Sequence, residues 1–324
     1  MDFSIFKRNL VQNMHTIAFY NLENLFDALL TESTRDLDFT PEGSRKWTPR
    51  RYQRKLERLA SVIGTIGLEE SGKPPVLLGV AEVENGAVVQ QLLDTPPLNG
   101  YNYGYVHYNS PDDRGMDTAL IYSRDHFKVL KSQPIPLLLQ ASNGEPEATR
   151  DILYVQGELN GQVLHIFVNH WPSRRTGNLE SDYKRLLAAK TIISFMDGIE
   201  AEFKEPSYVV MGDFNDGPTA ESVQALMDTD KFYNPMQDLY SRSRGSVRYR
   251  GSWNLFDQIM LSKGFLTDRN GGHRYIGANI FDEAFLKEAK GKYKGTPFRT
   301  YRGGGYKGGY SDHFPVYVQL MLDS

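Results

Sequence analysis

Short apolar runs recur along the whole chain and are separated by turn-forming residues, a pattern that indicates packed β-sheets rather than a helical bundle. The nine clearest runs are rich in Val, Ile, Leu, Phe and Tyr, and they cover residues 16–20, 76–81, 101–108, 118–122, 152–158, 163–168, 208–211, 256–261 and 316–320. Asn160-Gly161 predicts a hairpin between two of them.

Helical spacing is found in three segments. The first begins at Pro49, the second covers 180–196, and the third covers 219–227 with Thr219 as its expected N-cap. In the second segment we expect a buried stripe that contains Leu186, Leu187, Ala189 and Ile193. Many strands with few helices predict sheet packed on sheet, with helices outside.

No linker or shift in composition divides the chain. Polar residues suited to chemistry recur from Asn21 to His313, so we expect one domain over residues 14–324 that brings them together. Met14 directly precedes the first strand-like run, and we expect residues 1–13 to be an appendage.

Composition narrows the chemistry. The chain has 37 basic and 40 acidic residues, a net charge of −3, which argues against binding nucleic acid through bulk charge. The absence of cysteine excludes disulfides, thiolate metal sites and a cysteine nucleophile, so any metal must bind oxygen or imidazole. No apolar run reaches the ~18 residues of a membrane span, and no signal peptide is visible. We expect a monomer that is cytoplasmic or, if a signal peptide was removed, periplasmic or secreted.

Four strand-like runs meet polar groups at one end. Asp213 and Asn215 follow the run 208–211, and their i, i+2 spacing places both on one side of an extended chain. Aspartate there could hold a hard cation or polarise a water, and asparagine could donate a hydrogen bond to a phosphoryl oxygen. The alternative is that both residues form a turn before Gly217-Pro218.

Polar residues also mark the other three strand ends. Glu82 ends an apolar strand, where its charge costs free energy unless it pairs or binds a cation such as Mg²⁺. Asp312 and His313 precede the last strand, and histidine is a base or a charge stabiliser near neutral pH. His170 follows the run 163–168. The alternative is that these residues are ordinary structural groups.

Arginines near these groups are candidates for phosphate contact. Arg174 and Arg175 follow His170 closely. Directly upstream of Asp257, which begins another strand, nine residues contain four arginines: Arg242, Arg244, Arg248 and Arg250. The alternative for this basic run is a solvated loop.

Together these motifs resemble the endonuclease/exonuclease/phosphatase superfamily. The resemblance rests on Gly-Asp-Phe-Asn at 212–215 and Ser-Asp-His-Phe-Pro at 311–315, with Asn21, Glu82, His170 and Asp257 in the expected order. It covers roughly residues 16–318. It implies an α+β fold, a four-layer α/β/β/α sandwich in which two mixed sheets pack face to face between outer helices.

The resemblance also implies a role for each residue. The metal site would hold Mg²⁺, with Mn²⁺ as a substitute, through Asn21, Glu82 and Asp312. The catalytic residues would be His170, Asp213, Asn215, Asp257 and His313, with Asp257 supporting the histidine at 313. The contacts to substrate phosphate would come from Arg114, Arg174 and Arg175. Two departures from the family pattern, Ala81 before the glutamate and Gln258 after Asp257, remove no catalytic atom.

We therefore expect a divalent-metal-dependent phosphoester hydrolase that uses in-line attack by water. The first hypothesis is a nuclease or related phosphodiesterase, whose substrate is nucleic acid or another phosphodiester. The second is a phosphomonoesterase, or a hydrolase of phospholipid or inositol-phosphate head groups, on the same site. The third, a catalytically inactive binding module, is disfavoured by the complete residue set. The choice of base between Asp213 and His313 stays open.

Overall fold

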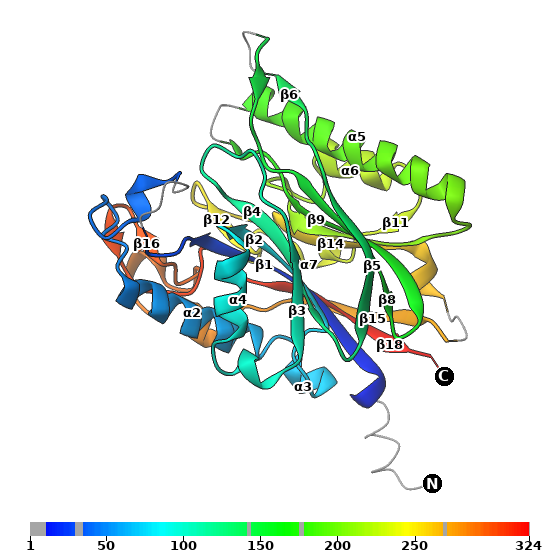
Figure 1. Ribbon diagram of the computed structural model, residues 1–324, viewed down its shortest axis with the longest axis horizontal. Helices are drawn as coiled ribbons and strands as arrows, with labels where there is room; N and C mark the ends of the chain where they lie inside the picture. Colours follow the sequence, from blue (N-terminus) through cyan, green and yellow to red (C-terminus); the bar gives the residue numbers. More distant parts are fainter. Residues whose placement is uncertain (1–10, 30–34, 141–143, 175–177, 268–270, 324) are drawn as a thin grey trace, which may run out of the picture.

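The computed structural model describes residues 11–29, 35–140, 144–174, 178–267 and 271–323 (Figure 1). Two six-stranded mixed sheets pack face to face between helices, which confirms the predicted four-layer sandwich. In spatial order the first sheet contains β15 (His273–Ile280), β18 (Val316–Leu322), β1 (Met14–Leu25), β2 (Leu77–Val83), β4 (Asp117–Ser123) and β3 (Tyr103–His107). The second contains β11 (Phe232–Tyr233), β14 (Asp257–Ser262), β10 (Ser207–Asp213), β9 (Gln162–His170), β8 (Ile152–Leu159) and β5 (Phe127–Ile135).

Each sheet is mixed because an inner strand has one parallel and one antiparallel neighbour. β1 runs parallel to β2 and antiparallel to β18, so strands from the two ends of the chain lie side by side. β10 runs parallel to β9 and antiparallel to β14. Each of the nine predicted runs overlaps one of these strands, and the hairpin at Asn160-Gly161 joins β8 to β9. The sequence analysis missed β5 and β15, which are edge strands with more polar residues.

The helices cover the outer faces of the sheets (Figure 1). On the side of the first sheet lie α2 (Pro49–Ile63), α3 (Leu68–Ser71) and α4 (Gly86–Leu93). On the side of the second lie α5 (Asn178–Glu202) and α6 (Glu221–Met227), and α7 (Met236–Leu239) contacts β14 and β15. Three pairs of short strands lie outside the two sheets: β6 (Leu139–Gln140) with β7 (Pro146–Glu147), β12 (Val247–Tyr249) with β13 (Ser252–Asn254), and β16 (Tyr301–Arg302) with β17 (Gly305–Tyr306). Short 3-10 helices cover Leu37–Phe39, Leu98–Gly100, Lys263–Leu266, Ala284–Leu286 and Gly291–Tyr293.

Two helix predictions were wrong in detail. The N-cap of α6 is Ala220 rather than Thr219, and it offers no side-chain cap. The buried stripe of α5 is rotated from the predicted one, because Leu186 and Ile193 are only partly buried. The residues that pack inward are Ala188, Ala189, Ile192 and Met196. The reason is electrostatic: the same face carries Arg185, whose guanidinium is drawn inside by Asp216 at 2.6 Å.

Apolar side chains form two clusters within the layers. The larger lies between the sheets and beneath α2 and α4, and the smaller lies between the second sheet and α5 and α6. Among the described residues, no helix is both long enough and apolar enough to cross a membrane. Domain organisation over 14–324 stays a prediction, and residues 1–10 of the predicted appendage lie outside the described part of the chain.

Candidate active site

Strand register brings the predicted site residues to one end of the sandwich. Asp213, the last residue of β10, is paired in register with His170 on β9 and with Asp257 on β14. On the facing sheet, Asn21 of β1 is paired with Ala81, so Glu82 is the next residue of β2. Residues 192 positions apart thereby become neighbours, since Asn21 Nδ2 donates to Asp213 Oδ2 at 3.1 Å.

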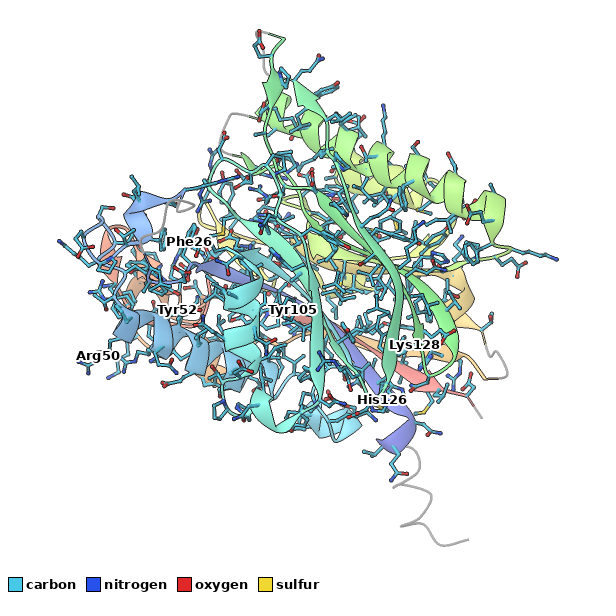
Figure 2. All side chains as sticks on the ribbon, viewed as in Figure 1. Phe26, Arg50, Tyr52, Tyr105, His126 and Lys128 are labelled. Carbon is cyan, nitrogen blue, oxygen red and sulfur yellow. The ribbon has the colours of Figure 1, made fainter. Side chains whose placement is uncertain are left out.

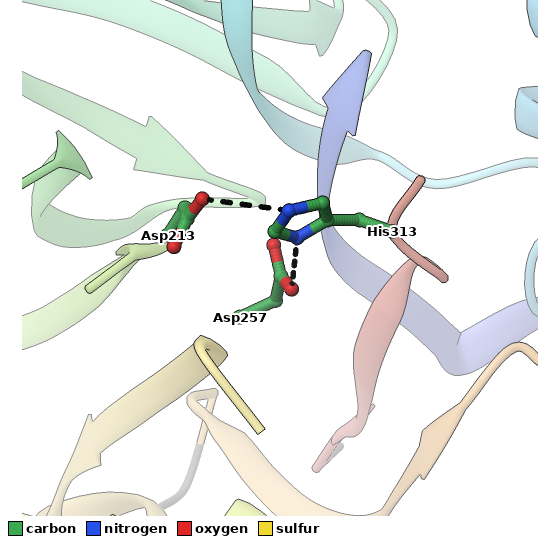
Figure 3. Close-up of side chains that lie close together, drawn as sticks. All are labelled: Asp213, Asp257 and His313. Atoms are coloured by element: carbon green, nitrogen blue, oxygen red, sulfur yellow. Dashed lines mark hydrogen bonds and ion pairs between the residues drawn. The ribbon is translucent and has the colours of Figure 1, made fainter. Parts of the chain in front are cut away.

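Asp257, His313 and Asp213 form a line of buried groups (Figure 3). His313 Nδ1 donates to Asp257 Oδ2 at 2.7 Å, and His313 Nε2 lies 3.8 Å from Asp213 Oδ2. Burial raises the pKa of Asp213 to about 7, with His313 opposing the rise and Asp257 adding to it. Burial alone would lower the pKa of His313, but the carboxylates of Asp257 and Asp213 outweigh it and hold that pKa well above its usual value. The imidazole is therefore oriented by one carboxylate and directed at another.

Glu82 lies on the other side of Asp213. Its Oε2 accepts from the Asn24 backbone N–H at 2.7 Å, and its Oε1 lies 3.3 Å from Asn21 Nδ2. His170 Nε2 is 3.9 Å from Glu82 Oε1 and 4.0 Å from Asp213 Oδ2. Glu82 has a φ of 63°, a left-handed conformation that is rare for such a residue and that is often found at functional sites.

Asn21 acts here through its amide nitrogen. Its Oδ1 accepts from the Glu23 backbone N–H at 3.0 Å, so the nitrogen faces the carboxylates of Glu82 and Asp213. In this geometry Asn21 bridges the two acids and fixes their separation.

The turn after β10 is held by several bonds. Asn215 has a φ of 50°; its backbone N–H donates to Asp213 Oδ1 at 2.9 Å and its Nδ2 to Trp171 O at 2.9 Å. Gly212 is required by close packing, because a Cβ there would lie 2.4 Å from Asn169 O. Asp213 and Asn215 therefore form a turn, as in the alternative interpretation, and at the same time lie in the site.

Two of the three predicted phosphate-contacting arginines are described, and their surroundings differ. Arg114 donates to the Asn24 side chain, next to the segment that holds Glu82, and its Nε lies 3.7 Å from Asp36. Arg174 donates to Asn215 O at 2.8 Å and to the Asp216 carboxylate, so its donors hold the turn. Arg175 lies outside the described residues.

Asp312 belongs to a second charged group, which the sequence analysis missed. Its Oδ2 accepts from Arg299 at 2.7 Å, and Arg299 Nε also donates to Glu23 Oε1 at 3.2 Å. Lys55 Nζ lies 4.0 Å from Glu23 Oε2 and donates to Thr300 at 2.6 Å. Burial raises the pKa of Glu23 and lowers that of Lys55 to about 8. Although burial opposes it, Arg299 holds the pKa of Asp312 below its usual value. The sequence signal that could have indicated this charged group was Glu23, an acidic residue two positions after Asn21.

The donors at this end suit a hard divalent cation, which prefers carboxylate oxygens. Glu82 Oε1 and Asp213 Oδ2 are joined by the single nitrogen of Asn21. Atoms of Asp213, Asp257 and His313 also lie within 4.8 Å of one another. Asp257 Oδ1 is buried and has no hydrogen-bond partner among the described residues, so this group could accept a further ligand.

Several solved structures share the fold. A protein from Bacteroides thetaiotaomicron is 16% identical, with 96% of this chain and 98% of that chain covered and a TM-score of 0.58. A mannosyl-6-phosphatase from the same organism is 16% identical, with 95% and 100% covered and a TM-score of 0.57. Truncated TDP2 from Caenorhabditis elegans is 14% identical, with 95% and 98% covered and a TM-score of 0.57. No curated protein sequence matches the chain.

The family is established by sequence as well as by fold. Residues 16–322 match the Endonuclease/Exonuclease/phosphatase family, and this range contains both sheets of the sandwich, except for the first two residues of β1, and every described residue of the site. The chain therefore belongs to the endonuclease/exonuclease/phosphatase family of phosphoester hydrolases.

Proposed function

We propose that this protein is a divalent-metal-dependent phosphodiesterase of the nuclease type, which hydrolyses its substrate by in-line attack of water. The observation that carries the hydrolytic reaction is the line of Asp257, His313 and Asp213, with contacts of 2.7 and 3.8 Å, beside the carboxylate of Glu82. The preference for a diester rests instead on His170 and on the arginines close to the site in the sequence. A gap of 3.8 Å is too long for a hydrogen bond, and an oxygen of the substrate or of water could bind both groups there.

Each residue of the line has a separate task. Asp257 accepts the Nδ1 hydrogen of His313, which fixes the ring and stabilises its charged form. His313 Nε2 then donates to a non-bridging oxygen of the phosphoryl group, where negative charge develops. Asp213 Oδ2 accepts a proton from the attacking water, and the backbone N–H of Asn215 holds the opposite oxygen of this carboxylate in place.

Glu82 is the residue we assign as the main ligand of Mg²⁺ or Mn²⁺, with Asn21 setting its position. Asp312 would add the oxygen that Arg299 leaves unoccupied. A bound divalent cation stabilises negative charge on the phosphate and on the leaving oxygen. We favour this place over the Asp257–His313 pair, because those two side chains already bond to each other.

Contacts to the phosphate complete the proposal. His170 Nε2 lies about equally far from Glu82 and Asp213, at 3.9 and 4.0 Å, and so faces the centre of the site. Asn215 uses one amide hydrogen on Trp171 and keeps the other for a phosphoryl oxygen. Arg114 and Arg175 are further candidates, whereas we assign Arg174 to the turn that it holds.

A phosphomonoesterase is the second candidate. A mannosyl-6-phosphatase shares this fold, so the fold also serves a protein whose substrate is a phosphomonoester. Nothing in the Asp257–His313–Asp213 line discriminates a diester from a monoester, since each residue contacts only the phosphoryl group or water.

The test is hydrolysis of bis-p-nitrophenyl phosphate, p-nitrophenyl phosphate and plasmid DNA, each with Mg²⁺, Mn²⁺ or EDTA. Cleavage of the diester and of plasmid that EDTA abolishes supports the proposal. Cleavage of the monoester alone supports the second candidate. Activity that is equal in EDTA, or that persists in Asp213→Asn protein, contradicts both.

A further inference from the structure

Two strongly basic segments flank the Asp312 side of the site. Residues 242–250 contain four arginines and no acidic residue, and residues 287–307 contain seven basic residues and one acidic residue, in a chain whose net charge is −3. The first segment is tied to the catalytic line, because Val247 pairs with His313 and the Phe314 N–H donates to Ser246 O at 2.7 Å. The second supplies Arg299, which binds Asp312.

The two segments enclose a cavity of about 120 Å³ between them. Its wall includes three arginines, one from the first segment and two from the second, and it reaches Asp312: Arg248, Arg299, Arg302, Tyr293, Thr296 and Asp312. Ligand sites for whole drug-sized molecules are typically about 300 Å³ or larger, so this cavity suits one small group of a larger ligand.

Two of the arginines still have donors to offer: Arg302, which is partly buried, and Arg248, which is exposed. The guanidinium of Arg302 lies 3.7 Å from the centre of the Tyr293 ring and donates to Glu288 at 3.1 Å, yet its buried Nε has no hydrogen-bond partner among the described residues. Arg248 donates to Gly251 O at 2.7 Å, and none of the described ion pairs includes it. A buried donor without a partner costs free energy that an oxyanion would recover.

The acidic group in the wall does not prevent binding of an anion. Arg299 neutralises Asp312 at 2.7 Å, and this arginine also serves Glu23. Arg302 forms an ion pair with Glu288. Arg248 forms no ion pair with any described carboxylate, so its positive charge is not compensated. The cavity is therefore a net cationic recess whose wall reaches Asp312, the residue directly before His313.

We propose that this cavity binds a second phosphate group of the substrate, next to the scissile phosphoester. The inference rests on the proposed function and narrows it to phosphoesters that carry a second oxyanion close by, such as nucleotide chains or bisphosphates. Guanidinium groups match phosphate oxygens through paired donors, so Arg248 and Arg302 would recognise this group and set specificity.

A pair of substrates that differ only in the second phosphate tests the inference: thymidine 5′-(p-nitrophenyl phosphate) with and without a 3′-phosphate. In the wild type we expect kcat/KM to be about tenfold or more higher for the 3′-phosphorylated compound, the size of one charge-assisted contact. In Arg248→Gln/Arg302→Gln protein this ratio should fall to about 1, whereas in Arg242→Gln protein it should stay. Arg242 is the matched control, because it is exposed in the same basic run and does not line the cavity.

Calorimetry on the same three proteins without substrate measures whether the cavity also binds free inorganic phosphate, in addition to a phosphate group attached to the substrate. We expect the double variant to bind phosphate about tenfold more weakly than the other two proteins. Equal binding by all three, or equal kcat/KM for the two substrates in the wild type, overturns the inference while leaving phosphodiester hydrolysis intact. Hydrolysis of neither substrate would instead count against the proposed function.

Discussion

The two ends of the sandwich each hold buried histidines, and the partners of those histidines are opposite in kind. At the site end, His313 lies between the carboxylates of Asp257 and Asp213. At the other end, rings from three separate elements surround Asn160, with His15 lying 5.0 Å from His126 and 5.2 Å from His273 between ring centres. The same strands connect both groups: β1 runs from His15 to Asn21, and β18 runs from the residues after His313 to the partner of His273.

The group around Asn160 is a neutral network. Asn160 Nδ2 lies 3.1 Å from His15 Nε2 and 3.4 Å from His273 Nε2, and Asn160 Oδ1 lies 3.2 Å from His126 Nδ1. Figure 2 places His126 near the start of β1, where the C-terminal end of β18 also lies. An amide that donates to His15 and His273 requires both rings to be uncharged, and burial lowers the pKa of His126, which donates to the amide oxygen.

Burial acts in the same direction at both ends, so the partner decides the outcome. Burial lowers the pKa of His15 to about 3 and that of His273 to about 4, with Lys73 opposing charge on His15 and Asp323 favouring it on His273. At the site, the carboxylates reverse the same effect and raise the pKa of His313. Acidic partners, rather than burial or strand position, therefore allow a buried histidine to carry a positive charge at the site end of the sandwich.

The largest expected effect comes from removing the acidic partner at the site. In Asp257→Asn protein, the amide no longer fixes the His313 ring or stabilises its charge, so kcat for a phosphodiester should fall by about 10²- to 10⁴-fold. Steady-state kinetics with bis-p-nitrophenyl phosphate measures this. A loss of less than about threefold would show that the carboxylate is not what distinguishes the two ends.

The second prediction gives the opposite end an acidic partner through Asn160→Asp, which the left-handed backbone at this position tolerates. In the wild type, neutral His15 and His273 stabilise the fold above about pH 6.5, and this contribution is lost as pH falls toward their lowered pKa values, by roughly 2 kcal/mol each at pH 5. An aspartate would pair with charged imidazoles, so the variant should be weakened relative to wild type at pH 7.5 and much less so at pH 5.

Urea unfolding at both pH values measures this difference, and comparison with wild type cancels groups that titrate elsewhere. Asn109→Asp is the control, because Asn109 is an exposed residue outside the histidine group. If Asn160→Asp changes the free energy of unfolding equally at both pH values, the partner does not set the direction of the pKa shift.

The smallest expected effect concerns the cation. Mg²⁺ at 100 times its dissociation constant should stabilise the wild type by about 2.7 kcal/mol, seen as a rise in Tm. Glu82→Gln should lose most of this rise. Glu84→Gln is the matched control two residues along, since Glu84 accepts from the Asp27 N–H and takes no part in the proposed site. Equal rises in Tm for wild type and Glu82→Gln would show that Glu82 is not the main ligand of the cation.

The sequence was sufficient for the architecture because apolar runs and turn residues are local signals. It also predicted which polar residues follow strands, and register then explains why Asp213, His170 and Asp257 become neighbours. The edge strands β5 and β15 were missed because their composition is mixed, whereas the edge strand β3 was predicted. The buried stripe of α5 was predicted correctly only at Ala189, because a buried Arg185 cannot be distinguished from an exposed one without its partner, Asp216.

Long-range charge pairing is the part that sequence could not supply. Arg299 and Glu23 are 276 residues apart, and nothing local marks Arg299 as the partner of Asp312. Glu84 shows the same limit: it directly precedes Asn85, the N-cap of α4, yet its carboxylate accepts from the Asp27 N–H, 57 residues away in the sequence. Its burial raises the pKa of Glu84 to about 7.

The measurement that tests the central claim most directly is kcat/KM for bis-p-nitrophenyl phosphate with Mg²⁺, in wild type, Asp213→Asn and Asp197→Asn proteins. The control makes the same chemical change at an exposed position on α5. Because Asp213 joins His313 to the Glu82 side of the site, we predict a loss of at least about 100-fold, or ~2.7 kcal/mol, in Asp213→Asn and none in Asp197→Asn. Equal activity in all three proteins would contradict the claim that the strand ends at Asp213 form the reaction site.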